Sequence, residues 1–236
     1  MSVRAVFFDL GGTLFSYGSL RSVFGRALAG VAREYALDAS PDEVRHAYQV
    51  SVMTVLSEYA DRPYYRHSDL FAEAHARMLE RLGVPAAAHR ESPVSAGPTG
   101  LGLERVTPRD GVRSVLERLR AADLHLAIVS NIDDDQFEAI WNVLGLADCF
   151  DAITTSEAAG SCKPDGRIFE VAVAKAGVAP EAVAFVGDSL HHDVAGANAA
   201  GMRSIWLSSA PPEPDSPHVP DHIIRDLREL PELLLR

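Results

Sequence analysis

Three short apolar stretches of the chain end in polar residues that are suited to chemistry. Asp9 ends the first stretch, Ser130 and Asn131 end another, and Asp188 follows a third. Carboxylates serve as nucleophiles and as ligands of hard cations, while hydroxyl and amide groups bind oxyanions. Taken singly, each residue could be only a turn residue or a helix N-cap. If the three stretches are parallel strands, however, their ends meet at one crevice, where these side chains would form one site.

Two further residues fit such a site. Only two of the 22 basic residues are lysines, Lys163 and Lys175, and Lys163 precedes Pro164 in an expected loop before a helix. Asp193 lies five residues after Asp188 and adds a third carboxylate. A lone lysine beside crowded carboxylates could neutralise charge on a bound anion. The three carboxylates would themselves be costly to crowd together without a cation.

The positions of these residues depend on a regular alternation of helices and strands. After Pro108 short apolar stretches alternate with segments of helical periodicity, which predicts right-handed crossovers and a parallel sheet covered on both faces. The expected fold is therefore α/β, with a doubly wound, Rossmann-like core. The expected strands are 3–10, 125–130, 151–155, 182–187, 203–207 and 221–224, and the expected helices are 111–122, 133–144, 167–176, 193–200 and a short one at the C-terminus.

A helical insert separates the first strand from the rest of the core. Residues 40–43, Ser-Pro-Asp-Glu, open a helix with a capping box, and a second helix over 69–82 stops at Gly83. Residues 84–107 are rich in proline and glycine and are expected to be a return linker. The expected domains are thus a core of 1–14 and 106–236, and a helical cap of 15–105 that includes the linker.

Composition excludes several classes of protein. The chain has 236 residues, is 47% apolar and carries a net charge of −11. This composition is globular, and the negative charge disfavours nucleic acid and anionic membranes as partners. No membrane span or signal peptide is apparent, so a cytoplasmic protein is expected, with Cys149 and Cys162 reduced. A monomer and a homodimer are both compatible with the sequence.

Four motifs in order resemble those of the haloacid dehalogenase-like hydrolase superfamily. They are Phe8-Asp9-Leu10-Gly11-Gly12-Thr13-Leu14, Val129-Ser130-Asn131, Lys163-Pro164, and Gly187-Asp188-Ser189 with Asp193-Val194-Ala195-Gly196-Ala197. The insert is similar to the cap of that family's first subclass. The resemblance implies a phosphatase-like member that acts on a small phosphorylated metabolite.

The resemblance also implies a role for each motif residue. Asp9 would attack phosphorus and form an aspartyl phosphate, and Lys163 would stabilise the transferring group. The implied Mg²⁺ ligands are Asp9, Asp188, Asp193 and the backbone carbonyl of Gly11. The implied phosphate-binding groups are Ser130, Asn131 and the amides around Gly12 and Thr13.

Gly11 departs from the family's usual pattern. Most phosphatases that the chain resembles carry a second aspartate at this position, as the general acid and base. Three interpretations stay open: a phosphatase that needs good leaving groups or takes an acid from the cap, a relative with different chemistry, or a protein that binds phosphorylated ligands without turning them over. His191-His192, beside Asp188, could supply an acid or be only an exposed helix turn.

Two other reaction types are less compatible with the residues. Haloacid dehalogenases also lack the second aspartate, but they need no metal and usually have no acid at the position of Asp188. Phosphonate-cleaving relatives use a cap lysine, and residues 15–105 contain none. In the cap, the segment 62–66, Arg-Pro-Tyr-Tyr-Arg, could bind an anion or only cover a loop. We therefore expect a Mg²⁺-dependent phosphohydrolase, with a binding protein and a dehalogenase as alternatives.

Overall fold

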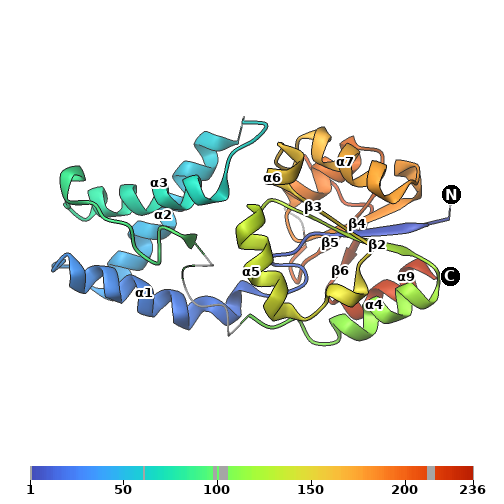
Figure 1. Cartoon of the computed structure of the whole chain (residues 1–236), viewed down its shortest axis with the longest axis horizontal. Coiled ribbons are helices and arrows are strands. Elements are labelled where there is room, and N and C mark those ends of the chain that lie inside the picture. The colour runs from blue at the N-terminus through green and yellow to red at the C-terminus, as the bar shows by residue number, and fades with distance from the viewer. Residues whose placement is uncertain (1, 61, 98–99, 101–105, 212–215, 236) are drawn as a thin grey trace.

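The computed structural model describes residues 2–60, 62–97, 100, 106–211 and 216–235, and its core is a parallel six-stranded sheet (Figure 1). The strand order is β3-β2-β1-β4-β5-β6. The strands are β1 (Ala5–Phe8), β2 (His125–Ser130), β3 (Ala152–Thr155), β4 (Val183–Gly187), β5 (Arg203–Leu207) and β6 (His222–Ile224). The expected α/β fold is confirmed, because every strand pair among them is parallel.

The central strand β1 is buried on both faces, as its continuous apolar sequence predicts. Val6 and Phe8 pack into one core cluster, whereas Ala5 and Phe7 pack into the other. The first cluster is covered by α4 (Val112–Ala121), α5 (Asp134–Leu144) and α9 (Leu230–Leu234), and the second by α7 (Gly166–Ala176) and α8 (Gly196–Ala199). Because β1 lies between β2 and β4, the residues that follow these three strands share one edge of the sheet.

Three helices form a separate lobe beside the sheet, at the left of Figure 1. They are α1 (Arg21–Glu34), α2 (Pro41–Tyr59) and α3 (His67–Arg81), which we call the helical lobe. The expected capping box is present at Ser40 and Glu43. The lobe has apolar clusters of its own, centred on buried residues such as Met78 and Val55. Of the expected return linker, residues 98–99 and 101–105 lie outside the described residues.

The segment after β4 differs from the helix expected over 193–200. Residues Leu190–Ala195 form a π-helical turn, in which the amide of Val194 donates to the carbonyl of Ser189 over 3.1 Å, and α8 follows as a single turn. The wide turn brings the Asp193 side chain back against Gly187, where a Cβ atom would lie 2.3 Å from the Asp193 Cγ. The Asp193 side chain therefore packs against the last residue of β4.

No helix among the described residues is both long and apolar enough to cross a bilayer.

Candidate active site

The three aspartates expected at the strand ends are brought together. Asp9, Asp188 and Asp193 each offer a carboxylate oxygen, and these oxygens lie within 4.8 Å of one another. Asp9 and Asp193 are buried, whereas Asp188 is exposed at the rim. The backbone carbonyl of Asp188 accepts a hydrogen bond of 2.9 Å from the Trp206 indole on β5. This contact fixes the loop that carries Asp188.

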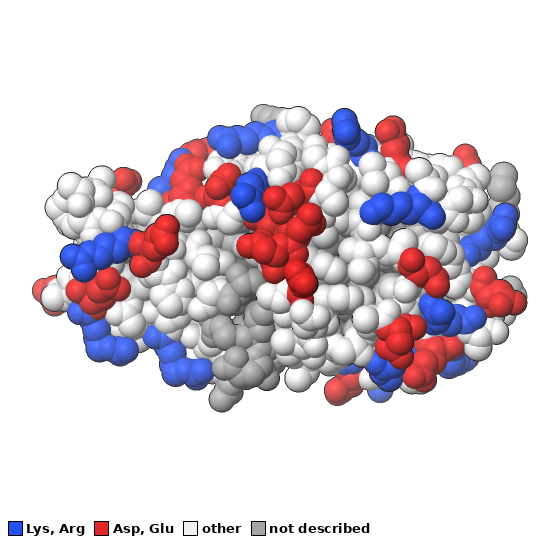
Figure 2. Space-filling view, in the orientation of Figure 1, with Lys and Arg blue, Asp and Glu red and all other residues white. Residues whose placement is uncertain are grey.

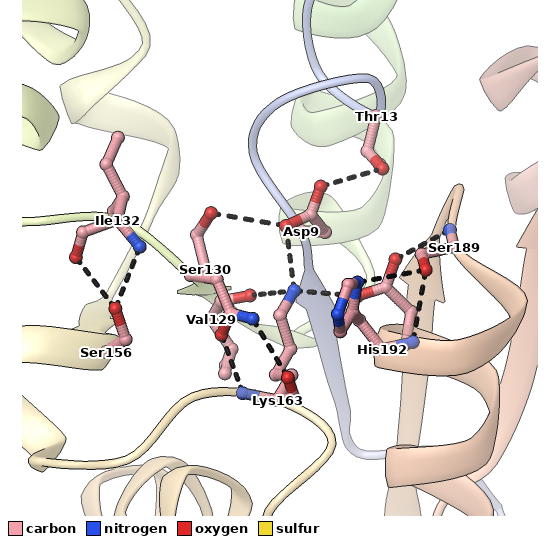
Figure 3. Close-up of polar contacts among 11 residues, drawn as sticks. Asp9, Thr13, Val129, Ser130, Ile132, Ser156, Lys163, Ser189 and His192 are labelled. Atoms are coloured by element: carbon pink, nitrogen blue, oxygen red, sulfur yellow. Dashed lines mark hydrogen bonds and ion pairs between the residues drawn. The ribbon is translucent and has the colours of Figure 1, made fainter. Parts of the chain in front are cut away.

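Lys163 lies at the centre of the site, between two of the carboxylates (Figure 3). Its Nζ donates to Asp9 Oδ1 and to Asp193 Oδ1, both over 2.7 Å, and to the Val129 carbonyl over 2.9 Å. The Lys163 side chain is 2% exposed. All three N–H groups of the ammonium are therefore used within the protein, which holds Asp9 in one orientation.

The site carries more negative than positive charge. Burial, followed by the charges of Asp9 and Asp193, raises the pKa of Asp188 to about 7, although this carboxyl lies at the exposed rim. Burial and Asp9 also raise the pKa of Asp193, against the opposing effect of Lys163. Burial alone would lower the pKa of Lys163, but Asp193 and Asp9 raise it. Three carboxylates facing one ammonium favour binding of a further cation.

Residues 9–15, which follow β1 and include Asp9, form a loop that we call the catalytic loop, and the expected phosphate-binding residues lie in it or near it. The hydroxyls of Ser130 and Thr13 donate to the two oxygens of Asp9, over 3.2 and 3.3 Å. The Asn131 amide instead donates to the Lys163 carbonyl over 2.9 Å and accepts from the Lys163 amide over 2.6 Å. The Gly12 amide donates to the Phe15 carbonyl. In this structure the Asn131 side chain and the Gly12 amide hold these loops, and their donation to a bound phosphate stays a prediction.

Gly12 in the catalytic loop is closely approached by the Asp188 side chain. A Cβ at Gly12, where φ is +89°, would lie 2.1 Å from Asp188 Oδ2. The Gly12 carbonyl accepts from Arg109, whose Nε lies 3.2 Å away. Gly12 therefore combines a left-handed backbone with a close contact to Asp188, and only glycine meets both demands.

His192 does not match the acid that the sequence suggested. Burial, and then Lys163, lower the pKa of His192 to about 4, so its imidazole is neutral at pH 7. For the alternative, an exposed helix turn, His191 is exposed but His192 is half-buried, and Ser189 caps the turn by accepting from the His192 amide.

A cavity of about 40 Å³ lies over the catalytic loop, where the lobe meets the sheet. Among its lining groups are Gly11, Tyr17, Ser130 and Asn131 from the core, and His67 and Phe71 from α3. Of the two lining residues from the helical lobe, His67 is the polar one. Its buried Nε2 has no hydrogen-bond partner among the described residues. Burial lowers the pKa of His67 to about 4, so the imidazole is neutral at pH 7. Sequence reasoning did not single out Tyr17 or His67.

The segment 62–66 docks on the core, so its arginines are used in contacts within the protein. The Cys162 amide, next to Lys163, donates to the Pro63 carbonyl over 2.7 Å. Arg66 lies 3.7 Å from Asp133 and 3.4 Å from Glu157. Arg62 lies over the Tyr59 ring. This segment therefore joins the lobe to the two core loops that hold the site.

Asp133 caps the lobe helix α3 from the core. Its two carboxylate oxygens accept from the amides of His67 and Ser68, both over 2.8 Å, and the residue is fully buried. Burial alone would raise the pKa of Asp133, but these hydrogen bonds lower it. The carboxylate thus fixes the start of α3, and with it His67, over the cavity.

Replacing Asp133 with asparagine should loosen this docking. An asparagine side chain has one acceptor oxygen, so one of the two α3 amides loses its partner, at a cost of about 1–3 kcal/mol. We expect a lower midpoint in thermal unfolding and a KM raised about tenfold, since the cavity wall is no longer fixed. Asp69→Asn, in the exposed first turn of α3, is the matched control and should change neither. An Asp133→Asn protein with wild-type stability and KM would contradict this role.

Comparison with known proteins decides the family. The family model for haloacid dehalogenase-like hydrolases matches residues 3–201. The chain belongs to the haloacid dehalogenase-like hydrolase family. It is therefore a hydrolase, and the resemblance noted in its motifs is confirmed.

Three members of this family illustrate the similarity. Haloacid dehalogenase-like hydrolase domain-containing protein 3 of Bos taurus is 44% identical over 48% of this chain and 44% of its own length, so the match spans less than half of that relative. The glyceraldehyde 3-phosphate phosphatase of Methanothermobacter thermautotrophicus is 28% identical over 98% of this chain and 100% of its own. A 2-haloacid dehalogenase of Pseudomonas syringae pv. tomato superposes with a TM-score of 0.69 at 30% identity, covering 99% of both chains.

Proposed function

We propose that this hydrolase is a Mg²⁺-dependent phosphatase of a small phosphorylated metabolite, with Asp9 as its nucleophile. The observation that carries the proposal is the excess of carboxylates over ammonium groups at the strand ends. Asp9, Asp188 and Asp193 face the single Lys163, and the pKa of Asp188 is raised to about 7. Such a set of oxygen ligands suits Mg²⁺, which binds through a few carboxylates together with substrate phosphate and water.

The residues of the chain would share the work as follows. Asp9 attacks phosphorus in line with the leaving oxygen, and a new bond forms between its carboxylate and the phosphoryl group. Lys163 keeps Asp9 in place and offsets the charge of the phosphoryl oxygens. Ser130 and Thr13 donate to the Oδ1 and Oδ2 atoms of the same carboxylate and help to orient it. Asp9, Asp188, Asp193 and the Gly11 carbonyl would hold Mg²⁺, which supplies positive charge that draws the phosphate dianion to the carboxylate.

The substrate is expected to be small. One relative that matches the chain over nearly its full length is named a glyceraldehyde 3-phosphate phosphatase, and another, which matches about half of the chain, is named a phosphoserine phosphatase. We infer that the helical lobe acts as a cap, because His67 and Phe71 close the cavity over the catalytic loop. A cap of this kind excludes water during the reaction and selects substrates by their fit.

Two alternatives make different predictions. A dehalogenase is favoured by the similarity to the Pseudomonas enzyme, but it would leave the charge of Asp188 beside Asp9 unexplained. A protein that binds phosphorylated ligands without turnover would keep metal binding and lose only chemistry. A screen of phosphorylated metabolites with Mg²⁺, beside 2-chloropropionate without metal, distinguishes all three. Release of chloride in excess chelator would contradict the phosphatase.

Metal binding should stabilise the protein more strongly as the pH rises. The folded protein keeps a proton on Asp188 up to about pH 7, whereas an unfolded carboxyl loses its proton near pH 4. The metal-free fold therefore loses stability between these values, and Mg²⁺, which binds the deprotonated carboxylates, should restore it. At about 100 times its dissociation constant, Mg²⁺ should raise the free energy of unfolding by about 2.7 kcal/mol, which raises Tm by about 5–10 °C.

Thermal unfolding with Mg²⁺ and with chelator, at pH 5 and pH 8, measures this effect. We expect less than half of the pH 8 stabilisation at pH 5, and loss of phosphatase activity in chelator that returns with Mg²⁺. The Asp188→Asn protein is the control, since it should remove most of the shift at pH 8. A Mg²⁺ effect that is equal at both values of pH would contradict the assigned ligands.

A further inference from the structure

The Tyr17 hydroxyl occupies the space next to Gly11. A Cβ atom on residue 11 would lie 2.1 Å from the Tyr17 Oη and 2.8 Å from its Cζ. Positive φ is found at Gly12 and not at Gly11, so the backbone of residue 11 suits any residue. A side chain at position 11 would therefore have to displace the Tyr17 side chain, whereas the backbone there makes no demand for glycine.

Tyr17 is oriented toward the reacting centre. Its ring packs edge-on against Phe15, with 5.3 Å between ring centroids, and it lines the same cavity as Gly11 and Ser130. About half of the residue is exposed, while its hydroxyl end lies against Gly11, two residues after Asp9. The hydroxyl thus lies at the cavity wall, beside the loop that carries Asp9.

Cleavage of an alkyl phosphate ester is accelerated by a proton donor, because the alkoxide that leaves is a strong base. The other donors near Asp9 are already used: Lys163 makes three hydrogen bonds, and Ser130 and Thr13 donate to Asp9. The His192 ring Nδ1 lies 3.3 Å from the Ser189 hydroxyl. Within the described ranges, no hydrogen bond involves the Tyr17 hydroxyl. The His67 Nε2 also has no partner there, but it belongs to α3, whereas the Tyr17 hydroxyl lies beside Gly11 and is free for a substrate.

We propose that Tyr17 is a catalytic residue whose hydroxyl donates to the leaving oxygen of the phosphate ester. This inference rests on the proposed function. As Asp9 bonds to phosphorus, the bond from phosphorus to the leaving oxygen breaks, and its electron pair stays on that oxygen. The leaving oxygen then takes the phenolic proton. The water that later hydrolyses the aspartyl phosphate gives one proton to the phenolate, and its other proton stays on the released phosphate. Asp9 and Tyr17 thus return to their starting protonation states.

The test compares two substrates in the Tyr17→Phe protein. Glyceraldehyde 3-phosphate releases a poor leaving group that needs a proton, whereas 4-nitrophenyl phosphate releases a stable anion. We expect kcat to fall about 100-fold for the first and less than about threefold for the second. Tyr48→Phe is the matched control, because the Tyr48 hydroxyl is buried in the helical lobe with no described partner, and it should leave both rates unchanged. An unchanged Mg²⁺-dependent Tm in Tyr17→Phe separates loss of the donor from loss of the fold.

The outcomes distinguish this inference from the function on which it rests. Equal losses for both substrates in Tyr17→Phe, with a normal wild-type protein, would overturn the role of Tyr17 alone. Wild-type protein that hydrolyses neither substrate with Mg²⁺ would overturn the proposed function, and this inference with it. A 100-fold loss confined to the substrate with the poor leaving group supports the donor.

A pair of variants tests the shared space directly. Gly11→Asp alone should lose activity toward both substrates, because its side chain collides with the Tyr17 hydroxyl. Combining Gly11→Asp with Tyr17→Ala removes the collision and places a carboxyl group where the phenol was. We expect the double variant to hydrolyse glyceraldehyde 3-phosphate at least tenfold faster than Tyr17→Ala, with a new pH limb from the carboxyl. Equal rates in these two variants would show that the space beside Gly11 is not the donor's position.

Discussion

Replacing Asp9 with asparagine is expected to lower phosphatase turnover by about 10⁴-fold or more, the scale seen when nucleophiles are removed from other hydrolases. An amide is a poor nucleophile and cannot form the acyl phosphate. The fold should survive, because Lys163 keeps its bonds to Asp193 and to the Val129 carbonyl. Steady-state kinetics with Mg²⁺ and circular dichroism of the same preparation measure both expectations.

A matched substitution separates the nucleophile from a general effect of charge. Asp123 is exposed in a turn with φ of +58°, a conformation that asparagine tolerates, so Asp123→Asn should keep full activity. Mg²⁺ should still bind the Asp9→Asn protein, more weakly, through Asp188 and Asp193. Retained turnover in Asp9→Asn would place the nucleophile elsewhere and remove the basis of the proposed reaction.

Replacing Lys163 with methionine is expected to give the second large effect, on both catalysis and stability. The ammonium is buried and lies 2.7 Å from an oxygen of Asp9 and of Asp193. Methionine fills a similar volume but leaves both carboxylates without their partner, which costs about 3–5 kcal/mol for a buried pair. We expect turnover to fall by about 10³-fold, because the transferring group loses a fixed positive charge.

The second lysine of the chain provides the control. Lys175 is exposed on α7, and Lys175→Met should change unfolding free energy by less than about 0.5 kcal/mol and leave kcat intact. Denaturant unfolding and kinetics of the two variants, each with and without Mg²⁺, measure the difference. If both variants behaved alike, the assigned role of Lys163 would be wrong.

The core of the fold could be predicted because its signals are local. The apolar stretch that forms β1 needs no partner to be identified, and the parallel pairing then places the residues after β1, β2 and β4 at one edge. Asp9, Asp188 and Asp193 were therefore expected to meet, as they do. The capping box at Ser40 is likewise a pattern within four residues.

The parts that could not be predicted depend on contacts between distant segments. Tyr17 opens a short 3-10 helix, Tyr17–Leu20, after the catalytic loop, and nothing in its neighbours reveals that its hydroxyl lies beside Gly11. His67 and Asp133 are 66 positions apart, and their hydrogen bond exists only once the helical lobe is docked. The role of Asn131 in holding the Lys163 loop likewise depends on a bond between residues 32 positions apart. Short motifs locate residues such as Asn131 but do not reveal which distant groups they contact.

The cavity of about 40 Å³ over the catalytic loop has a kinetic consequence. This volume is too small for a phosphate ester, since a single water molecule takes about 30 Å³ in the liquid. Substrate entry and product release must therefore involve separation of α3 from the core, against the two hydrogen bonds at Asp133. Such motions take microseconds to milliseconds. The frequency of this opening sets an upper limit on turnover, so solvent viscosity should slow the fastest substrates more than the slow ones.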